Sequence, residues 1–191
     1  MAAILSTTFI ILAVAVRAII HFFKTGSFGI RLADTRRQPI AAIAGAAFLL
    51  SFAISLAMIW LDALMIWPIS KLDFGYVSHG AFLVGLSGIA IVVIAQVQMG
   101  NAWRIGVDPS EVTQLVTNGL YRRSRNPIYF GVFLYWFGIA MTFPHPAIWT
   151  LAVVCWVAIE VIVRKVEERY LHDLHGKTFE QYRKSTNRYL L

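Results

Sequence analysis

The feature that most constrains this chain is a series of apolar segments close in length to a membrane-spanning helix. They cover residues 2–23, 39–61, 80–99 and 127–143, and a fifth runs from the break at residues 144–146 to about Val163. A helix needs about 20 apolar residues to cross a bilayer. Only 14% of the residues are charged, whereas a soluble domain has nearer ~25%. The sequence therefore predicts an all-α integral membrane protein with five transmembrane helices.

Polar and small residues within these segments carry further expectations. Arg17 lies near the end of the first segment, where its long side chain is expected to snorkel to the interface. Gln96 and Gln98 lie at the far end of the third, where amides meet water at little cost. The same segment holds small residues that let membrane helices approach closely, namely Gly85, Ser87 and Gly88. The three-residue break requires the fourth and fifth helices to form an antiparallel hairpin.

The basic residues are concentrated on one predicted side of the membrane. With five spans, the segments after the first and third spans share a side with the C-terminus. They hold four (24–37), four (104–125) and seven (164–188) of the 17 Lys and Arg residues. By the positive-inside rule this side is cytosolic and the N-terminus lies outside. The same pattern explains the net charge of +7 and disfavours a nucleic-acid-binding function.

Residues 113–131, TQLVTNGLYRRSRNPIYFG, combine three features that rarely occur together. Thr117-Asn118-Gly119 predicts a tight turn, because Asn and Gly tolerate positive φ. Tyr121 follows within a group of arginines. Asn126-Pro127 then predicts the start of a helix, with Asn as the cap and Pro in the first position. We interpret this stretch as a functional site on the cytosolic side.

An acidic face follows at the end of the fifth apolar segment. Glu160, Arg164 and Glu167 have the i, i+4, i+7 spacing of one helix face, and Arg164 also reaches Glu168 at i+4. These residues could simply be ion pairs that end a span. A Glu as deep as Glu160, with a second pair of carboxylates beyond it, favours a site.

The predicted hairpin places this acidic face beside the helix start at Asn126. Helix N-termini attract anions, and aromatic rings and carboxylates attract cations. A zwitterionic ligand with an additional cationic centre suits both halves, and S-adenosylmethionine is such a ligand. The histidines are scattered and the single cysteine, Cys155, lies in an apolar run, so no metal site is predicted.

The run LVTNGLYRRSRNPIYFG and the later EERYLHDLHGKTFEQYRKSTNRYL resemble the isoprenylcysteine carboxyl methyltransferase family in its compact microbial five-span form. That family shares this C-terminal pattern with phospholipid methyltransferases. The resemblance covers roughly residues 98–191. It divides the chain into residues 1–99, with three transmembrane helices and their loops, and a catalytic half, 100–191, with the cofactor loop, the hairpin and an amphipathic tail. It also implies a prokaryotic plasma membrane.

The resemblance implies S-adenosylmethionine as cofactor, S-adenosylhomocysteine as product, and a role for individual residues. The residues implied to contact the adenosyl part are Gln114, Leu115, Val116 and Tyr121. Those implied to cradle the methionine part are Asn126, Pro127, Ile128 and Tyr129, with Glu167 holding its ammonium group. Asn126 stands where many members have His. Either Val163 or Arg164 corresponds to a second Arg of some members.

The resemblance implies methyl transfer to a carboxylate of a lipophilic substrate, as in a protein-S-isoprenylcysteine O-methyltransferase, with a lipid amine as the alternative acceptor and the bilayer itself as partner. A carboxylate, as in a prenylated cysteine, needs only a cationic guide such as Arg164. A lipid amine needs a proton acceptor, for which Glu168 is the candidate, while Tyr129 would face the reacting methyl group. A non-catalytic membrane module or small transporter is the rival class. It predicts polar residues in mid-span or repeated halves, and the sequence has neither.

Overall fold

The computed structural model describes residues 1–28, 39–69, 71–72, 74–103 and 113–189, and this part of the chain is helical, without strands. Four helices have the length and composition to cross a membrane. They are Ala2–Thr25 (α1 Ala2–Phe9, η1 Ile10–Val16, α2 Arg17–Thr25), Pro39–Ala63 (α3), Val77–Ala102 (α4 Val77–Met99, η2 Gly100–Ala102) and Pro146–His175 (α6 Pro146–Ile162, η4 Val163–Glu167, α7 Glu168–His175). The shorter apolar helix α5, Pro127–Thr142, completes the five-helix bundle. The predicted fold class is confirmed.

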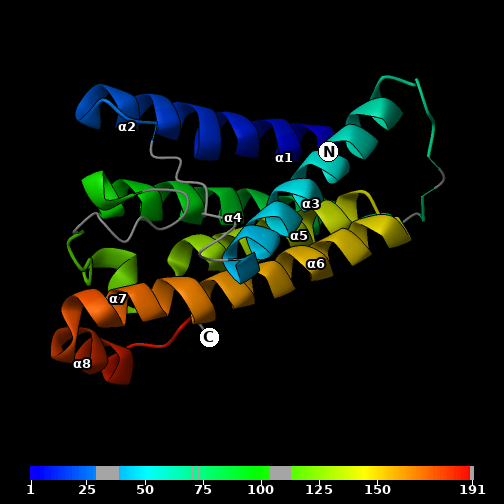
Figure 1. The fold of residues 1–191 in the computed structure, drawn as a ribbon. Helices are drawn as coiled ribbons and strands as arrows, with labels where there is room; N and C mark the ends of the chain where they lie inside the picture. The colour runs from blue at the N-terminus through cyan, green and yellow to red at the C-terminus, as the bar shows by residue number, and fades with distance from the viewer. Residues whose placement is uncertain (29–38, 70, 73, 104–112, 190–191) are drawn as a thin grey trace.

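The connections between helices gather at two opposite ends of the bundle (Figure 1). At one end, the α3–α4 connection meets the α5–α6 turn, where the Leu72 amide donates to the Pro144 carbonyl at 3.1 Å. At the other end lie the end of α2, the described residues 113–126 before α5, and the C-terminal helices α7 and α8 (Lys177–Ser185). The predicted alternation of the spans is therefore present, and the basic tail lies with the 113–126 loop at one end.

The closest helix pair is α4 with α5, and glycines make its contact possible. A Cβ atom added to Gly88 would lie 2.5 Å from the Gly131 carbonyl oxygen, and one added to Gly138 would lie 2.6 Å from the Gly85 Cα. The prediction for Gly85 and Gly88 is thus supported by the packing. Ser87 faces outward and bonds back to the Val84 carbonyl.

Gly88→Ala is expected to destabilise the bundle by about 1–3 kcal/mol, because a methyl group there overpacks two backbones that cannot separate locally. Gly80→Ala is the matched control, since it lies on the same helix and an added Cβ meets no atom within 4 Å. Thermal unfolding in detergent, followed by circular dichroism, measures the difference. Equal melting temperatures for the two variants would contradict the packing argument.

The remaining helices complete the core around α5. Phe9 of the first span stacks on Tyr135 at 4.3 Å between ring centroids, and Phe52 of α3 packs edge-on against Trp136 at 5.2 Å. The helix α6 follows α5 through a short turn, as predicted, but packs mainly against α3. These aromatic contacts hold the first span and α3 against α5.

The last span does not end near Val163 as the apolar pattern suggested. The helix runs from Pro146 to His175, because no Gly or Pro interrupts it before Gly176, which has φ +49°. A π-helical segment, Val163–Glu167, lies in the middle. Such a segment adds a residue to the turn, so side chains beyond it rotate away from the face that ideal 3.6-residue spacing assigns to them.

The first span also contains a π-helical segment, Ile10–Val16, and Arg17 follows it directly. The expectation that Arg17 snorkels to the interface is wrong: the residue is 5% exposed. Its guanidinium lies over the Trp103 ring at 4.8 Å and donates to the Gly100 carbonyl. Gln96, expected at the interface, is likewise buried and donates to the Ala13 carbonyl at 2.9 Å.

Candidate functional site

The loop before α5 is held against the end of α4 by one glutamine. Gln98 accepts a hydrogen bond from the Leu120 amide at 2.8 Å. Gly119 has φ +58°, as the turn prediction requires, and a Cβ there would lie 2.5 Å from the Gln98 amide group. Only glycine combines this backbone with so close an approach. The short helix η3, Gly119–Arg122, therefore begins at a fixed position.

A cavity of about 680 Å³ lies between the end of α4 and the 113–118 strip. Its lining includes the three residues expected to contact an adenosyl group, Gln114, Leu115 and Val116, together with Gln98 and residues 99–102. Thr113 links this strip to α7 through a 3.4 Å contact with the Tyr170 hydroxyl. The end of α4, η2 and the 113–118 strip thus border a space large enough for a nucleoside-sized ligand.

Tyr121 lies on η3 and is 6% exposed. Among the described residues its hydroxyl has no hydrogen-bond partner. Burial, and next the negative charge of Glu167, raise the pKa of Tyr121 well above its usual range. The phenol is therefore a neutral donor, close enough to Glu167 to feel its charge. A buried donor without a partner is suited to an incoming acceptor group.

Tyr129 and Glu167 form the closest contact among the predicted site residues. The Tyr129 hydroxyl donates to Glu167 Oε1 at 2.5 Å. Pro127 is buried at the first position of α5, as predicted, and Ile128 and Tyr129 follow half-buried. The π-helical segment ends at Glu167, and so the structure brings the start of α5, η3 and the last span together at one place.

Asn126 occupies the predicted cap position but its side chain makes no capping bond. The amide group instead donates to the Arg188 carbonyl at 3.3 Å, and the Asn126 backbone amide donates to the same oxygen at 3.0 Å. The prediction that the Asn126 side chain caps this helix is therefore wrong. Asn126 joins the loop to the C-terminal segment, because the tail offers its amides an acceptor.

The structure does not place Glu168 and Arg164 with Tyr129. Glu168 accepts from Arg125 at 2.9 Å and from both Arg188 Nε and Nη2 at 2.9 Å. Arg164 pairs with Glu160 at 2.5 Å rather than with Glu168, and its side chain is 56% exposed. Glu160 also accepts from the Tyr189 hydroxyl at 2.6 Å. These charges face the tail, on a different side of the helix from Glu167.

The tail holds the loop through contacts that the sequence pattern did not reveal. Residues 124 and 187 form a parallel bridge, and the Tyr182 hydroxyl donates to the Tyr121 carbonyl at 2.5 Å. The Arg125 guanidinium reaches the Arg183 carbonyl at 3.1 Å. Arg125 could have been expected to hold the loop from its position in the arginine group. The sequence gives no comparable indication for Tyr182 and Arg188 beyond their place in an amphipathic tail.

Tyr182→Phe is expected to loosen the tail by about 0.5–1.5 kcal/mol, because the Tyr121 carbonyl loses its buried donor. Burial raises the pKa of Tyr182 to about 12, against about 10 in an unfolded chain. The folded state therefore keeps this proton longer, and its contribution to stability is present below pH ~10 and lost as the pH rises towards ~12.

The melting temperature should fall less steeply with rising pH across that range for Tyr182→Phe than for the unmodified protein. Tyr76→Phe is the matched control, because Tyr76 is 94% exposed. A Tyr182→Phe variant whose pH dependence equals that of the unmodified protein would show that the phenol titrates without a folded-state shift.

The fold and this site define a class: a helical membrane protein with a candidate ligand cavity at the end of α4 and a tyrosine–carboxylate pair between the start of α5 and the last span. A family model described as phospholipid methyltransferase matches residues 77–178, more than half of the 191-residue chain. The chain belongs to the phospholipid methyltransferase family, and it is a membrane methyltransferase. No curated protein and no solved structure matches it. The family match covers α4, the loop, the hairpin and α7.

Proposed function

We propose that this methyltransferase takes its methyl group from S-adenosylmethionine, with the adenosyl part in the 113–118 cavity and the methionine part towards Tyr121, Tyr129 and Glu167. Family membership supports this donor. The residues of the site also suit this cofactor. The Glu167 carboxylate and the tyrosine rings can attract its ammonium and sulfonium groups. The Tyr121 hydroxyl, which has no hydrogen-bond partner among the described residues, can donate to its carboxylate. The bound cofactor supplies a methyl group already activated by the positive sulfur.

The residues then act by holding and orienting rather than by covalent chemistry. Gln114, Leu115 and Val116 are proposed to line the adenosyl part, and Asn126, Pro127 and Ile128 to border the methionine part. Glu167 is proposed to accept hydrogen bonds from the ammonium while its Oε1 keeps the Tyr129 hydroxyl in place. Positioning of this kind accelerates transfer by fixing the approach of the acceptor.

The acceptor best supported is the amine of a phospholipid. The observation that carries this choice is the placement of Arg164 in an exposed pair with Glu160, on a different side of the helix from Glu167. The family match is compatible with either acceptor. An amine loses a proton during methylation. The Tyr129 oxygen is proposed to accept that proton while the Tyr129 hydroxyl proton moves to the Glu167 carboxylate, to which it is already hydrogen-bonded. We assign Glu168, which two arginines hold, to fixing the tail.

The second candidate is O-methylation of a prenylated cysteine carboxylate. It is favoured by the resemblance of residues 115–131 and 167–190 to isoprenylcysteine carboxyl methyltransferases. In that reaction no proton is lost, and Arg164 would have to exchange its Glu160 partner for the substrate. Arg164→Leu should then raise the KM for the acceptor, whereas an amine acceptor should be indifferent to it.

Radiolabel transfer from S-adenosylmethionine tests the proposal directly. The purified protein in lipid nanodiscs is given either phosphatidylethanolamine or a farnesylcysteine analogue, and label in the phospholipid is the expected result. Label in the cysteine analogue alone would replace the first acceptor with the second. Calorimetry that detects no binding of the cofactor or of S-adenosylhomocysteine to folded protein would overturn the whole proposal.

We also propose that the cavity opens to the cytosol of a prokaryotic cell, with the N-terminus outside. The basic segments support this orientation. Reporter fusions after Gly75 and at the C-terminus should report opposite sides of the membrane, with the C-terminal one cytosolic. Fusions that report the same side would overturn the five-span orientation.

A further inference from the structure

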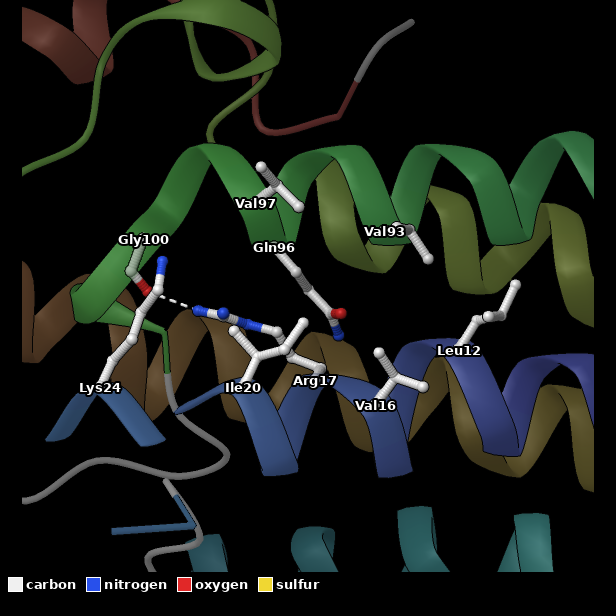
Figure 2. A pocket seen from close by; sticks show the side chains of 9 residues that line it. All are labelled: Leu12, Val16, Arg17, Ile20, Lys24, Val93, Gln96, Val97 and Gly100. Carbon is white, nitrogen blue, oxygen red and sulfur yellow. Dashed lines mark hydrogen bonds between the residues drawn. The ribbon is translucent and has the colours of Figure 1, made fainter. Parts of the chain in front are cut away.

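A second hollow, separate from the ligand cavity, lies between the first span and α4. Its volume is about 210 Å³. Two facing stripes form its walls (Figure 2). The first-span stripe is Leu12, Val16, Arg17, Ile20 and Lys24, and the α4 stripe is Val93, Gln96, Val97 and Gly100. Of all these residues only Gly100 also lines the ligand cavity. We call this hollow the first-span groove.

The first-span groove changes from apolar to cationic along its length. Leu12 and Val93 lie at one end, while Lys24 and Gly100 lie at the other, with Arg17 pointing towards Gly100 (Figure 2). Leu12 and Lys24 are 12 residues apart, about 18 Å along a helix. One leaflet of a bilayer has a hydrocarbon depth of about 15 Å, half of the usual ~30 Å. The groove thus has the length and polarity of one membrane lipid.

Arg17 is a buried cation with no anionic partner among the described residues. It is 95% buried, being 5% exposed. Within the part of the chain that the structure describes, its Nε has no hydrogen-bond partner and no carboxylate pairs with it. The Gly100 carbonyl and the Trp103 ring offset only part of the charge. A buried charge is unfavourable unless it is paired, so the groove lacks the negative charge that Arg17 requires.

Lys24 lies seven residues after Arg17, two turns along the same helix face. It too has no ion pair with a described carboxylate, and it borders the same end of the groove. Two cations at one end favour a ligand with net negative charge over a zwitterion, whose cationic headgroup would approach Lys24. Arginine matches phosphate oxygens with two parallel hydrogen bonds.

We propose that the first-span groove binds one anionic phospholipid, with its phosphate at Arg17 and Lys24 and an acyl chain along Leu12, Val16 and Val93. Arg17 and Lys24 lie outside the residues that the family model matches. The proposal does not depend on the acceptor, because the lipid is bound for its phosphate and needs no amine or free carboxylate.

Native mass spectrometry of the full chain, released from phosphatidylcholine nanodiscs, tests the proposal. Phosphatidylglycerol is added to the discs, since it carries a phosphate and no amine. One retained phosphatidylglycerol per chain is expected, in preference to phosphatidylcholine. Arg17→Gln should reduce its apparent affinity by at least about tenfold. Arg169→Gln is the matched control, because its side chain is 80% exposed on α7 and should leave retention unchanged.

Val97→Trp tests the apolar half without touching the cation. Val97 lines the groove and is 67% exposed, so the larger ring should fill the groove without disturbing the core, and phosphatidylglycerol retention should fall. Equal retention of the two lipids, or full retention by both Arg17→Gln and Val97→Trp, would overturn the proposal. So would an Arg17→Gln variant that loses S-adenosylmethionine binding but keeps phosphatidylglycerol, which would assign Arg17 to the cofactor instead.

Discussion

Glu167→Gln is expected to weaken binding of S-adenosylmethionine by about 1.5–3 kcal/mol, the usual contribution of a hydrogen bond to a charged group. The substitution keeps the size of the side chain and removes the negative charge proposed to face the ammonium. It leaves an amide oxygen to accept from the Tyr129 hydroxyl, now 2.5 Å from the carboxylate. Isothermal calorimetry with the cofactor and with S-adenosylhomocysteine measures the loss.

Tyr129→Phe should behave differently, because its hydroxyl is proposed to act on the reacting groups rather than on the ammonium. A lower kcat with little change in cofactor affinity is expected, since an interaction made chiefly in the transition state affects turnover.

Glu180→Gln is the matched control for Glu167→Gln, as it removes a carboxylate from α8 that pairs with Arg183 at 3.0 Å. Cofactor affinities that are equal for Glu167→Gln and Glu180→Gln would place the site elsewhere.

Glu168→Gln is expected to release the C-terminal segment from the 124–126 loop. Removing one member of a buried ion pair typically costs about 3–5 kcal/mol, and Glu168 serves two arginines while its side chain is only 14% exposed. Limited trypsin digestion should therefore cut faster at Arg183, Lys184 and Arg188, and cofactor binding should fall as the loop loses its support.

The result separates the structural role of Glu168 from the alternative of a proton acceptor. A proton acceptor would lose turnover with an unchanged digestion rate and a changed pH profile. Glu160→Gln provides the comparison, because it removes the partner of Tyr189 and Arg164 but leaves the Glu168 contacts in place. Slow digestion of Glu168→Gln, equal to that of the unmodified protein, would contradict the tail-fixing role.

Features that depend on neighbouring residues in the sequence could be predicted well. The five helices follow from the length of apolar runs, and the basic end of the bundle follows from charge counted between them. The Gly119 turn and the Pro127 helix start follow from backbone preferences. The short turn at 143–146 returns the chain towards the start of α5, but the contact of Glu167 with Tyr129 also depends on the π-helical segment that sets the direction of Glu167.

Features that depend on distant contacts or on helix register could not be predicted from the sequence. The π-helical segment before Arg17 changes which side that residue faces, and no residue type in Ile10–Val16 announces it. A second such segment separates Glu167 from the face of Glu160 and Arg164. The tail captures Asn126 and Glu168 from about 20 to 60 residues away in the sequence, and residue spacing contains no information about that pairing.

The attachment of the tail to the loop also sets an order of events during synthesis. The Tyr121 carbonyl receives its donor from Tyr182, 61 residues later in the chain. At about 5–20 residues per second, the ribosome needs roughly 3–12 s to make that interval. During this time the five membrane helices can already insert, while the loop between α4 and α5 still lacks its partner. The methyl-transfer site is therefore expected to mature last, after the membrane helices are in place, and a nascent chain arrested before Tyr182 should be inserted but unable to hold its cofactor.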